Sequence, residues 1–315
     1  MTPSVRMIVS LKQLSVFAAV VENRGFGLAA GQLGMGQSSV SHTLAALEKA
    51  VGAPLVTRSS PIGPTVLGQD LLPHAQVALA AVRAIDAVVG AHHEAQPSGT
   101  VRIAASPTAS HRLVPDLLAR WSVELPDVHV RLFEGEDDEL VQWLDTGTVD
   151  CAILVDPLTT PAGGVELVRD AFRAVIRTDH PYSTQAQISL PELLEDPLLV
   201  SSSGCEPQIR HLHALSGVDY NPAQRVRELT TLLTMVDSDL GVAVMPALAA
   251  TMLPETLTMI DLIPRLERRL VFAGPTNRPW NPHISRLRDI AATIISATTS
   301  TGVGVGSRSR SGERE

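Results

Sequence analysis

The chain contains few cysteine and few aromatic residues, and both shortages narrow what it can be. Its 315 residues include two cysteines, Cys151 and Cys205, too few for the disulfide framework of a small secreted protein. Aromatic residues make up 3% of the sequence and hydrophobic residues 44%, so we expect large cores of aliphatic side chains. The length suffices for two or more domains, and the cysteine content favours a cytoplasmic setting.

Long apolar runs and catalytic signatures are also missing from the sequence. We expect no transmembrane helix and no secretory signal, because no run of about 18 apolar residues occurs and no basic stretch precedes an apolar one at the N-terminus. There is no Gly-x-Ser-x-Gly elbow, and the glycine repeats at 31–36 and 302–306 lack a preceding strand. The histidines at 92–93 and 211–213 lack metal-ligand spacing. We therefore predict no enzymatic activity, no cofactor and no metal.

The formal net charge of −8 is distributed unevenly along the chain. Residues 1–69 carry five basic and two acidic side chains, a net charge of +3, which leaves −11 for residues 70–315. A basic N-terminal part on an acidic body fits a head that touches nucleic acid and a body that does not. Because the head is only weakly basic, we expect two or more copies to share the phosphate contacts.

Residues 25–58 have the pattern of two short helices joined by a glycine turn, with Gly34 ending the first helix. The second helix is predicted from about Gln37 to Val51, with apolar side chains at Val40, Leu44 and Leu47. Its first turns carry small or polar side chains: Gln37, Ser38, Ser39, Ser41 and His42. Such side chains at a helix N-terminus suit phosphate oxygens, and glutamine can also read adenine edges in the major groove. This is a helix-turn-helix pattern, although an αα-hairpin with a solvated turn has a similar sequence.

These residues resemble the DNA-binding domain of LysR-type transcriptional regulators. The matching positions are Ala29, Ala30, Leu33, Gln37, Val40, Ser41, Leu44, Leu47, Glu48, Gly52, Pro54, Leu55, Arg58, Thr65 and Gly68. The resemblance implies a winged helix-turn-helix over residues 1–68 that binds double-stranded DNA. It implies DNA contacts from Gln37, Ser38, Ser39, Ser41, His42 and, in the wing, Arg58. It also implies a small-molecule effector and a homodimer or homotetramer, with RNA polymerase as a possible further partner.

A long helix is predicted after the wing, from Gln69 to about Ala91. Its apolar positions repeat at intervals of three and four residues: Ala75, Ala78, Val82, Ile85 and Val89. This spacing is that of a heptad seam, and the resemblance favours a dimerising linker helix over residues 69–92. The alternative left open by the pattern is a helix that packs on its own domain.

From residue 100 onward, apolar strands alternate with amphipathic helices, which predicts an α/β fold with a parallel sheet and helices on both faces. This part resembles the two-lobed, periplasmic-binding-protein-like effector domain of the LysR-type regulators. We place the effector-binding domain at residues 93–297, with lobe I at about 99–165 and 268–297 and lobe II at about 166–267. Residues 298–315 are rich in Thr, Ser and Gly and are predicted to be a disordered tail.

Ligands of open α/β sheets bind beyond the carboxyl ends of the strands, where the expected loops carry hydroxyl and acidic residues. The candidate effector-binding residues are Ser106, Thr108, Glu136, Ser202, Ser203 and Glu228. Thr108 can cap the following helix or, as the resemblance implies, contact the effector. The two glutamates would repel a carboxylate, so we expect a neutral or amino-bearing effector, unless salt bridges occupy these acids.

Cys205 resembles, by its position, the reactive cysteine of the peroxide-sensing branch of the same family. No second cysteine follows in residues 210–216, which argues against a disulfide switch. A redox-responsive regulator acting through Cys205 therefore stays an alternative to a metabolite-controlled one, and an inert loop cysteine is a third interpretation. A further alternative is a small-molecule-binding protein whose helical head serves assembly only.

Overall fold

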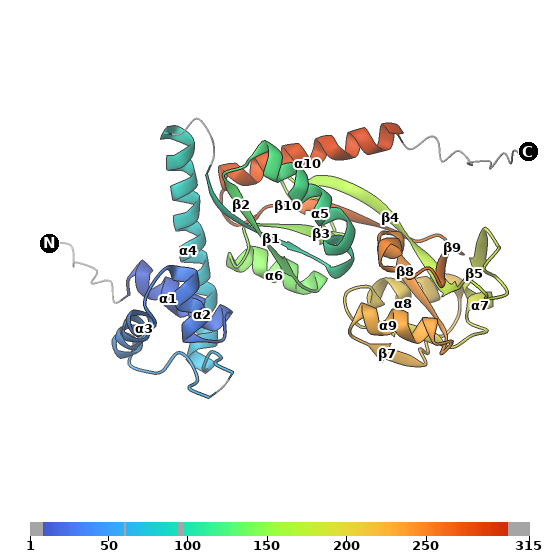
Figure 1. Ribbon diagram of the computed structural model, residues 1–315, viewed down its shortest axis with the longest axis horizontal. Helices are drawn as coiled ribbons and strands as arrows, with labels where there is room; N and C mark the ends of the chain where they lie inside the picture. The colour runs from blue at the N-terminus through green and yellow to red at the C-terminus, as the bar shows by residue number, and fades with distance from the viewer. Residues whose placement is uncertain (1–8, 60, 94–97, 302–315) are drawn as a thin grey trace, which may run out of the picture.

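The computed structural model describes residues 9–59, 61–93 and 98–301 (Figure 1). A helical head lies beside the first part of a long helix, and two α/β lobes follow one another away from it. Helix α4 links the head to lobe I, and lobe II lies at the far side of lobe I from the head (Figure 1).

Three helices form the head: α1 (Leu11–Glu22), α2 (Phe26–Leu33) and α3 (Gln37–Val51). A capping box starts α1, since Ser10 Oγ accepts the Gln13 amide and the Gln13 side chain accepts the Ser10 amide. The glycine at position 34 ends α2 at φ +62°, in the left-handed conformation that favours glycine. The predicted face of α3 is buried in the head core together with Phe17, Val20 and Leu55.

A short wing follows α3 and joins it to α4 (Val66–His93). Glu48, on α3, accepts the Leu55 amide at 2.9 Å, and a single antiparallel bridge pairs Val56 with Pro64. The start of α4 passes so close to this strand that a Cβ on Gly68 would lie 2.0 Å from the Leu55 carbonyl oxygen. Only glycine permits this approach, which holds the wing against the base of α4.

Helix α4 does not present the predicted seam as one free face. Ala75 is buried in the core of its own head, Ala78 packs against that core, and Val82 lines a gap between head and body. Ile85 and Val89 are exposed, at 61% and 51%. The exposed apolar side chains of the middle and end of α4 are Val77, Ile85, Val88 and Val89. The N-terminal residues of the predicted seam, Ala75 and Ala78, thus pack within their own chain: a heptad spacing marks an apolar stripe but does not say what covers it.

By length and composition, one described helix is apolar enough to cross a membrane, over residues 66–90 of α4. Asp70, Arg83 and Asp86 interrupt its apolar residues, and Arg83 pairs with Asp150 of lobe I at 3.1 Å. Single helices packed within other proteins meet the same criterion, so this finding is weak evidence for a membrane span.

Lobe I contains the elements β1 (Gly99–Ala105), α5 (Pro107–Glu124), β2 (Val128–Glu134), α6 (Asp137–Thr146), β3 (Cys151–Val155), β10 (Glu267–Ala273) and α10 (Pro282–Thr301). Strand β1 pairs in parallel with β2 and β3, but β10 is antiparallel to β3 and β4. Trp121, Phe272 and surrounding aliphatic side chains fill the core between the sheet and helices α5 and α10. The last helix continues past the predicted end at 297 to Thr301, and the rest of the predicted tail lies outside the described residues.

Lobe II contains β4 (Val165–Arg177), β5 (Gln187–Ser189), α7 (Leu190–Leu193), β6 (Leu198–Ser201), α8 (Glu206–Ser216), β7 (Gln224–Val226), α9 (Leu229–Asp237), β8 (Val242–Pro246), a 3₁₀ helix η1 (Ala247–Met252) and β9 (Leu257–Ile263). Strand β4 pairs with β10 in lobe I and then with β8 and β9 in lobe II. The parallel pairs predicted from the sequence are present in both lobes, but the whole sheet is mixed, because the two strands that cross between the lobes, β4 and β10, run antiparallel to their neighbours.

Candidate functional site

The polar first turns of α3 form an open surface on the head. Gln37, Ser38, Ser39, Ser41 and His42 are all exposed, and their side chains form no hydrogen bond with the described residues. Arg58 lies nearby in the wing, with its side chain 87% exposed and a weak ion pair of 3.9 Å to Glu48. Such an exposed pair contributes little to stability and leaves the guanidinium available to another anion.

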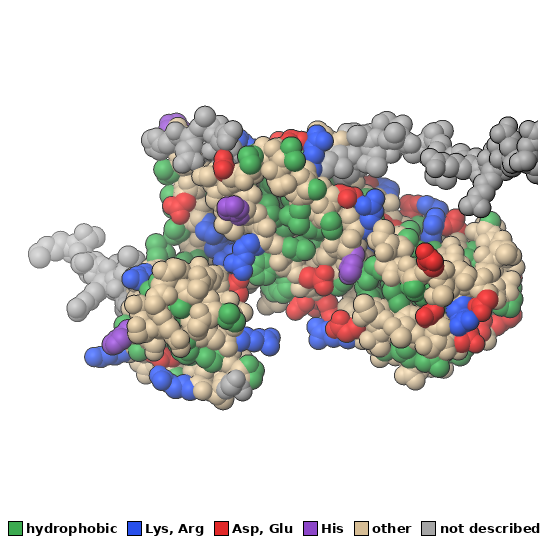
Figure 2. Space-filling view, viewed as in Figure 1, with side chains coloured by type: hydrophobic (Ala, Val, Ile, Leu, Met, Phe, Trp, Pro, Cys, Tyr) green, Lys and Arg blue, Asp and Glu red, His purple; other side chains and the backbone are tan. Residues whose placement is uncertain are grey.

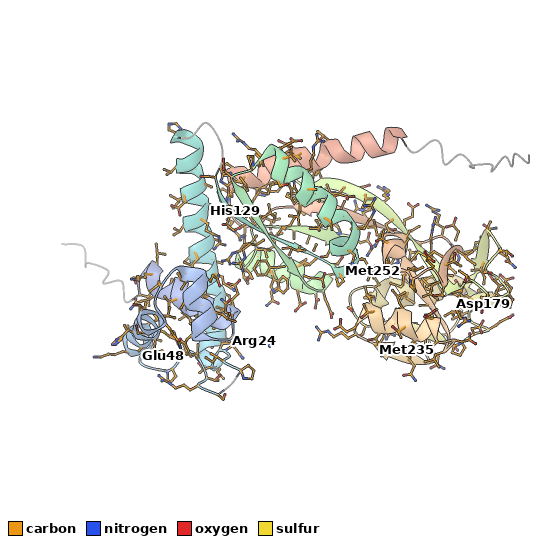
Figure 3. The ribbon with its side chains drawn as sticks, in the orientation of Figure 1. Arg24, Glu48, His129, Asp179, Met235 and Met252 are labelled. Atoms are coloured by element: carbon orange, nitrogen blue, oxygen red, sulfur yellow. The ribbon has the colours of Figure 1, made fainter. Side chains whose placement is uncertain are left out.

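Besides Lys12 of α1, two exposed basic residues of the head were not among the predicted site residues. Lys49 lies in the last turn of α3, and Arg24, labelled in Figure 3, follows the C-cap of α1 in a left-handed conformation at φ +50°. Figure 2 shows basic side chains projecting around the rim of the head. Charge alone could have marked these two residues, but their position relative to α3 required the structure.

A cleft of about 220 Å³ opens between the two lobes, at the ends of their strands. Its lining residues are Pro107, His111, Glu134, Gly135, Glu136, Glu139, Ser203, Arg227, Glu228, Leu229, Thr230 and Met252. Met252, labelled in Figure 3, lies between the lobes. Of the predicted effector residues, Glu136, Ser203 and Glu228 line this cleft. Ser202 does not, and its hydroxyl donates to the Val226 carbonyl at 3.4 Å.

The two glutamates occupy equivalent places at the starts of helices on opposite lobes. Glu136 is the N-cap of α6, and Glu228 is the N-cap of α9. Arg227 reaches from lobe II to Glu136 at 3.6 Å, so one of the predicted glutamates is held by a salt bridge across the cleft. Glu228 forms no ion pair among the described residues. The cleft therefore keeps a surplus of acidic side chains.

Behind the cleft, a buried ion pair joins the two crossing strands. Arg268 of β10 and Asp170 of β4 are cross-strand partners, and their side chains are 1% and 3% exposed. Arg268 Nη2 lies 2.9 Å from Asp170 Oδ2, and Nε donates to the same oxygen at 3.3 Å. The Leu248 amide also donates to this carboxylate. Neither residue was predicted from the sequence, since nothing local marks an arginine that will become buried.

Thr108 contacts this pair and does not cap its helix. The N-cap of α5 is Ser106. Thr108 lies inside the first turn of the helix and is buried, with 3% of its surface exposed. Arg268 Nη2 donates to Thr108 Oγ1 at 2.9 Å. The capping interpretation of Thr108 was therefore wrong. The N-cap position lies two residues before Thr108, at Ser106, and the Thr108 hydroxyl accepts a hydrogen bond from a buried guanidinium instead.

Cys205 lies at the other side of the same guanidinium, at the N-cap of α8 in lobe II. Arg268 Nη1 approaches its Sγ at 3.9 Å. Burial raises the pKa of the Cys205 thiol to about 11, although Arg268 acts in the opposite direction. A thiol with a raised pKa holds little thiolate at neutral pH, so its reactivity as a nucleophile is reduced.

Two buried polar atoms near this cluster have no hydrogen-bond partner in the described structure. They are Oγ of Ser106 and Oδ1 of Asp137. Burial raises the pKa of Asp137 to about 6, with Arg268 opposing the shift. Buried polar groups are nearly always paired, so these two atoms are places where a small ligand could add a hydrogen bond.

Family models match most of the chain. The helix-turn-helix of bacterial regulatory proteins of the lysR family matches residues 11–69, and the LysR substrate-binding domain matches residues 94–294. The chain belongs to the LysR family. This LysR-family protein is therefore a DNA-binding transcriptional regulator with an effector-binding domain, and the predicted fold class and function are confirmed. The interpretation of the head as an assembly module alone is not supported.

Individual relatives match this chain over most of their own length. A probable regulator, LrrA, from Synechococcus elongatus is 32% identical over 93% of this chain and 100% of its own length. A probable hydrogen peroxide-inducible genes activator from Mycobacterium leprae is 32% identical over 75% of this chain and 78% of its own. A solved cysteine-to-aspartate variant of full-length OxyR from Pseudomonas aeruginosa is 25% identical and covers 90% of this chain and 94% of its own, with a TM-score of 0.66. These LysR relatives are regulators, in keeping with the predicted absence of enzymatic activity.

Proposed function

We propose that this regulator reads DNA through the N-terminal half of α3, with the wing holding the backbone. Gln37, Ser39 and His42 would face base edges or nearby phosphates, because they are exposed on the turns that begin the helix. Ser38, Ser41 and Arg58 would mainly contact phosphates. The single observation that carries this proposal is the exposure of these side chains beside a buried, rigid α3 core.

We expect Gln37→Ala and Arg58→Ala to weaken DNA binding in different ways. Gln37→Ala should cost about 1–3 kcal/mol, concentrated at one base position. Arg58→Ala should weaken binding to all sequences and reduce the salt slope by about 1, because one phosphate contact is lost. Fluorescence anisotropy with the DNA upstream of its own gene, at several salt concentrations, measures both.

Arg112→Ala is the matched control, because Arg112 is an exposed arginine of lobe I that already pairs with Asp116. It should change neither the affinity nor the salt slope. Unchanged base preference in the Gln37 variant would remove that residue from the proposed readout.

We also propose that the chain acts as a homodimer or homotetramer, with a head over residues 1–68, a linker helix over 69–92 and an effector-binding domain over 93–297. The exposed apolar side chains near the end of α4, Ile85, Val88 and Val89, support an interface there. Exposed apolar side chains gathered on one helix are a common mark of protein contact.

The effector would bind in the cleft between the lobes, and we propose a small amino-bearing metabolite. Glu134, Glu136, Glu139 and Glu228 line the cleft, whereas its basic lining residue, Arg227, is already paired with Glu136. This surplus of carboxylates would attract an ammonium group and repel a free carboxylate. Because the cleft touches both lobes, a ligand with different affinity for two lobe arrangements would shift the population between them.

A thermal-shift comparison of 1,4-diaminobutane with the uncharged 1,4-butanediol tests the chemical class. Ligand at about 100 times its dissociation constant stabilises by about 2.7 kcal/mol, which is several degrees for a domain of this size. We expect the diamine to raise the melting temperature and the diol not to. Glu228→Gln should reduce the shift, while Glu255→Gln, an exposed residue of lobe II outside the cleft, should not. Equal shifts with both compounds would contradict the proposal.

Redox control through Cys205 is the second candidate, because its sulfur and the Thr108 hydroxyl contact the same guanidinium. Peroxide would oxidise the thiol to a sulfenic acid and be reduced to water. The raised thiol pKa disfavours this reaction. If peroxide changes DNA binding and Cys205→Ser abolishes that change, the metabolite proposal fails and the redox one stands.

A further inference from the structure

A second and larger cavity lies where the head, the linker helix and lobe I meet, away from the cleft between the lobes. Its volume is about 460 Å³, within the range of small-molecule sites. Its lining residues include Ser15, Leu33, Leu79, Arg102, Phe133 and Trp143. They come from α1 and α2 of the head, from α4, and from β1, β2 and α6 of lobe I.

The walls of this joint cavity are apolar and partly aromatic. Phe133 and Trp143 lie edge to face with ring centroids 6.5 Å apart. Trp143 lies so close to Gly135 that a Cβ there would be 2.5 Å from the ring, so the glycine makes room for the indole. Aliphatic side chains such as Leu33 and Leu79 complete the walls from the head and the linker helix. An apolar ring or acyl chain suits such a lining.

Arg102 brings a positive charge to this apolar lining. Its guanidinium donates one hydrogen bond among the described residues, from Nη1 to the Thr148 carbonyl at 3.3 Å. The acidic residues that act favourably on it are engaged elsewhere: Glu22 pairs with Arg131 at 3.7 Å and Asp150 with Arg83 at 3.1 Å. Within the described residues, Arg102 forms no ion pair. A half-buried cation without a carboxylate partner is unfavourable, and an anion beside it would relieve this.

The surroundings of Arg102 act on its positive charge in both directions: burial and Arg83 disfavour it, and Glu22 and Asp150 favour it. Burial and the nearby Arg83 both lower the pKa of Arg102, the effect expected when a cation lies among apolar groups and like charges. Figure 2 shows basic side chains gathered where the head and α4 approach lobe I. The lining of this joint therefore holds two basic residues, Arg83 and Arg102, and one acidic residue, Glu22, whereas the lining of the cleft between the lobes is mainly acidic.

We propose that the joint cavity is a second effector site, which binds an apolar carboxylate through an ion pair with Arg102. The ring or acyl chain of the ligand would lie against Phe133 and Trp143. Because the lining combines residues of the head, the linker helix and lobe I, the bound ligand would hold the head at one angle to the body. Its effect on DNA binding would then be independent of occupancy of the cleft between the lobes.

Titration of the full chain with 4-phenylbutanoate, followed by calorimetry and melting temperature, tests this site. The uncharged 4-phenylbutanamide has the same shape and is the ligand control. We expect saturable binding of the acid and none of the amide. Arg102→Gln should weaken binding of the acid at least about tenfold, which corresponds to about 1.4 kcal/mol. Arg120→Gln, which removes an exposed arginine of α5 paired with Glu124, should leave binding unchanged.

A second variant keeps Arg102 and fills the cavity from the head. Ser15→Phe, on α1, should also abolish binding of the acid while far-ultraviolet circular dichroism stays that of the parent protein. Equal binding of acid and amide, equal binding by the Arg102 and Arg120 variants, or no saturable binding would each overturn the proposal.

Discussion

Replacing Arg268 by alanine should destabilise the effector domain by about 3–5 kcal/mol, because the substitution leaves a buried carboxylate without its partner. Asp170 is 3% exposed on its side chain, and the Leu248 amide alone would remain beside it. The loss also removes the hydrogen bond to Thr108. Since Arg268 and Asp170 lie on the two strands that cross between the lobes, the damage should reach both lobes.

Urea unfolding of the full chain, followed by circular dichroism, measures this effect. Arg265→Ala is the control, because Arg265 forms an exposed pair with Glu267 near the start of the same strand and should change stability by no more than about 0.5 kcal/mol. An Arg268→Met, Asp170→Leu double variant should recover much of the lost stability, since a buried ion pair can be exchanged for apolar packing. Equal midpoints for the Arg268 and Arg265 single variants would show that the buried pair is dispensable.

An Ile85→Asp substitution should lower the affinity for a two-half-site DNA by about 100-fold or more, because a monomer binds with one head and loses the advantage of linked sites. Ile85 is 61% exposed in the single chain, so the aspartate costs little there. In a dimer joined along α4, the same aspartate would be buried without a partner, and the interface would separate.

Sedimentation velocity and DNA binding should be measured on the same samples. Leu158→Asp is the control, because Leu158 is a fully exposed apolar residue in the loop that follows β3 and is remote from α4. The control should stay oligomeric and keep its affinity. If the Ile85 variant also stays dimeric, the interface lies elsewhere on the chain.

The head could be predicted from the sequence because its determinants are local. Glycine at 34 and the apolar spacing of Val40, Leu44 and Leu47 act within one or two helical turns, and the structure places them as expected. Family resemblance in consecutive residues supported the same interpretation. Here, local propensity and tertiary packing agree, so the pattern alone sufficed.

The face of α4 that a partner could cover was not determined by its periodicity. Ala75 and Ile85 both belong to the predicted seam, yet one is buried in the head core and the other is exposed. A stripe of apolar residues is needed both where a helix packs on its own domain and where it packs on a partner chain. Only the position of the head and lobe I around the helix decides which part remains free.

By itself, the sequence determined the family, the helix-turn-helix, the alternation of strands with helices in the body, and the glutamates that line the cleft between the lobes. Tertiary structure decided the centre of the effector domain, where Arg268 meets Asp170 across 98 positions of the chain and approaches Thr108 and Cys205. It also decided the isolation of Arg102 at the joint of head and body. The physical reason is that a charge becomes functional through its desolvation and its partners, and both depend on distant segments that the fold brings together.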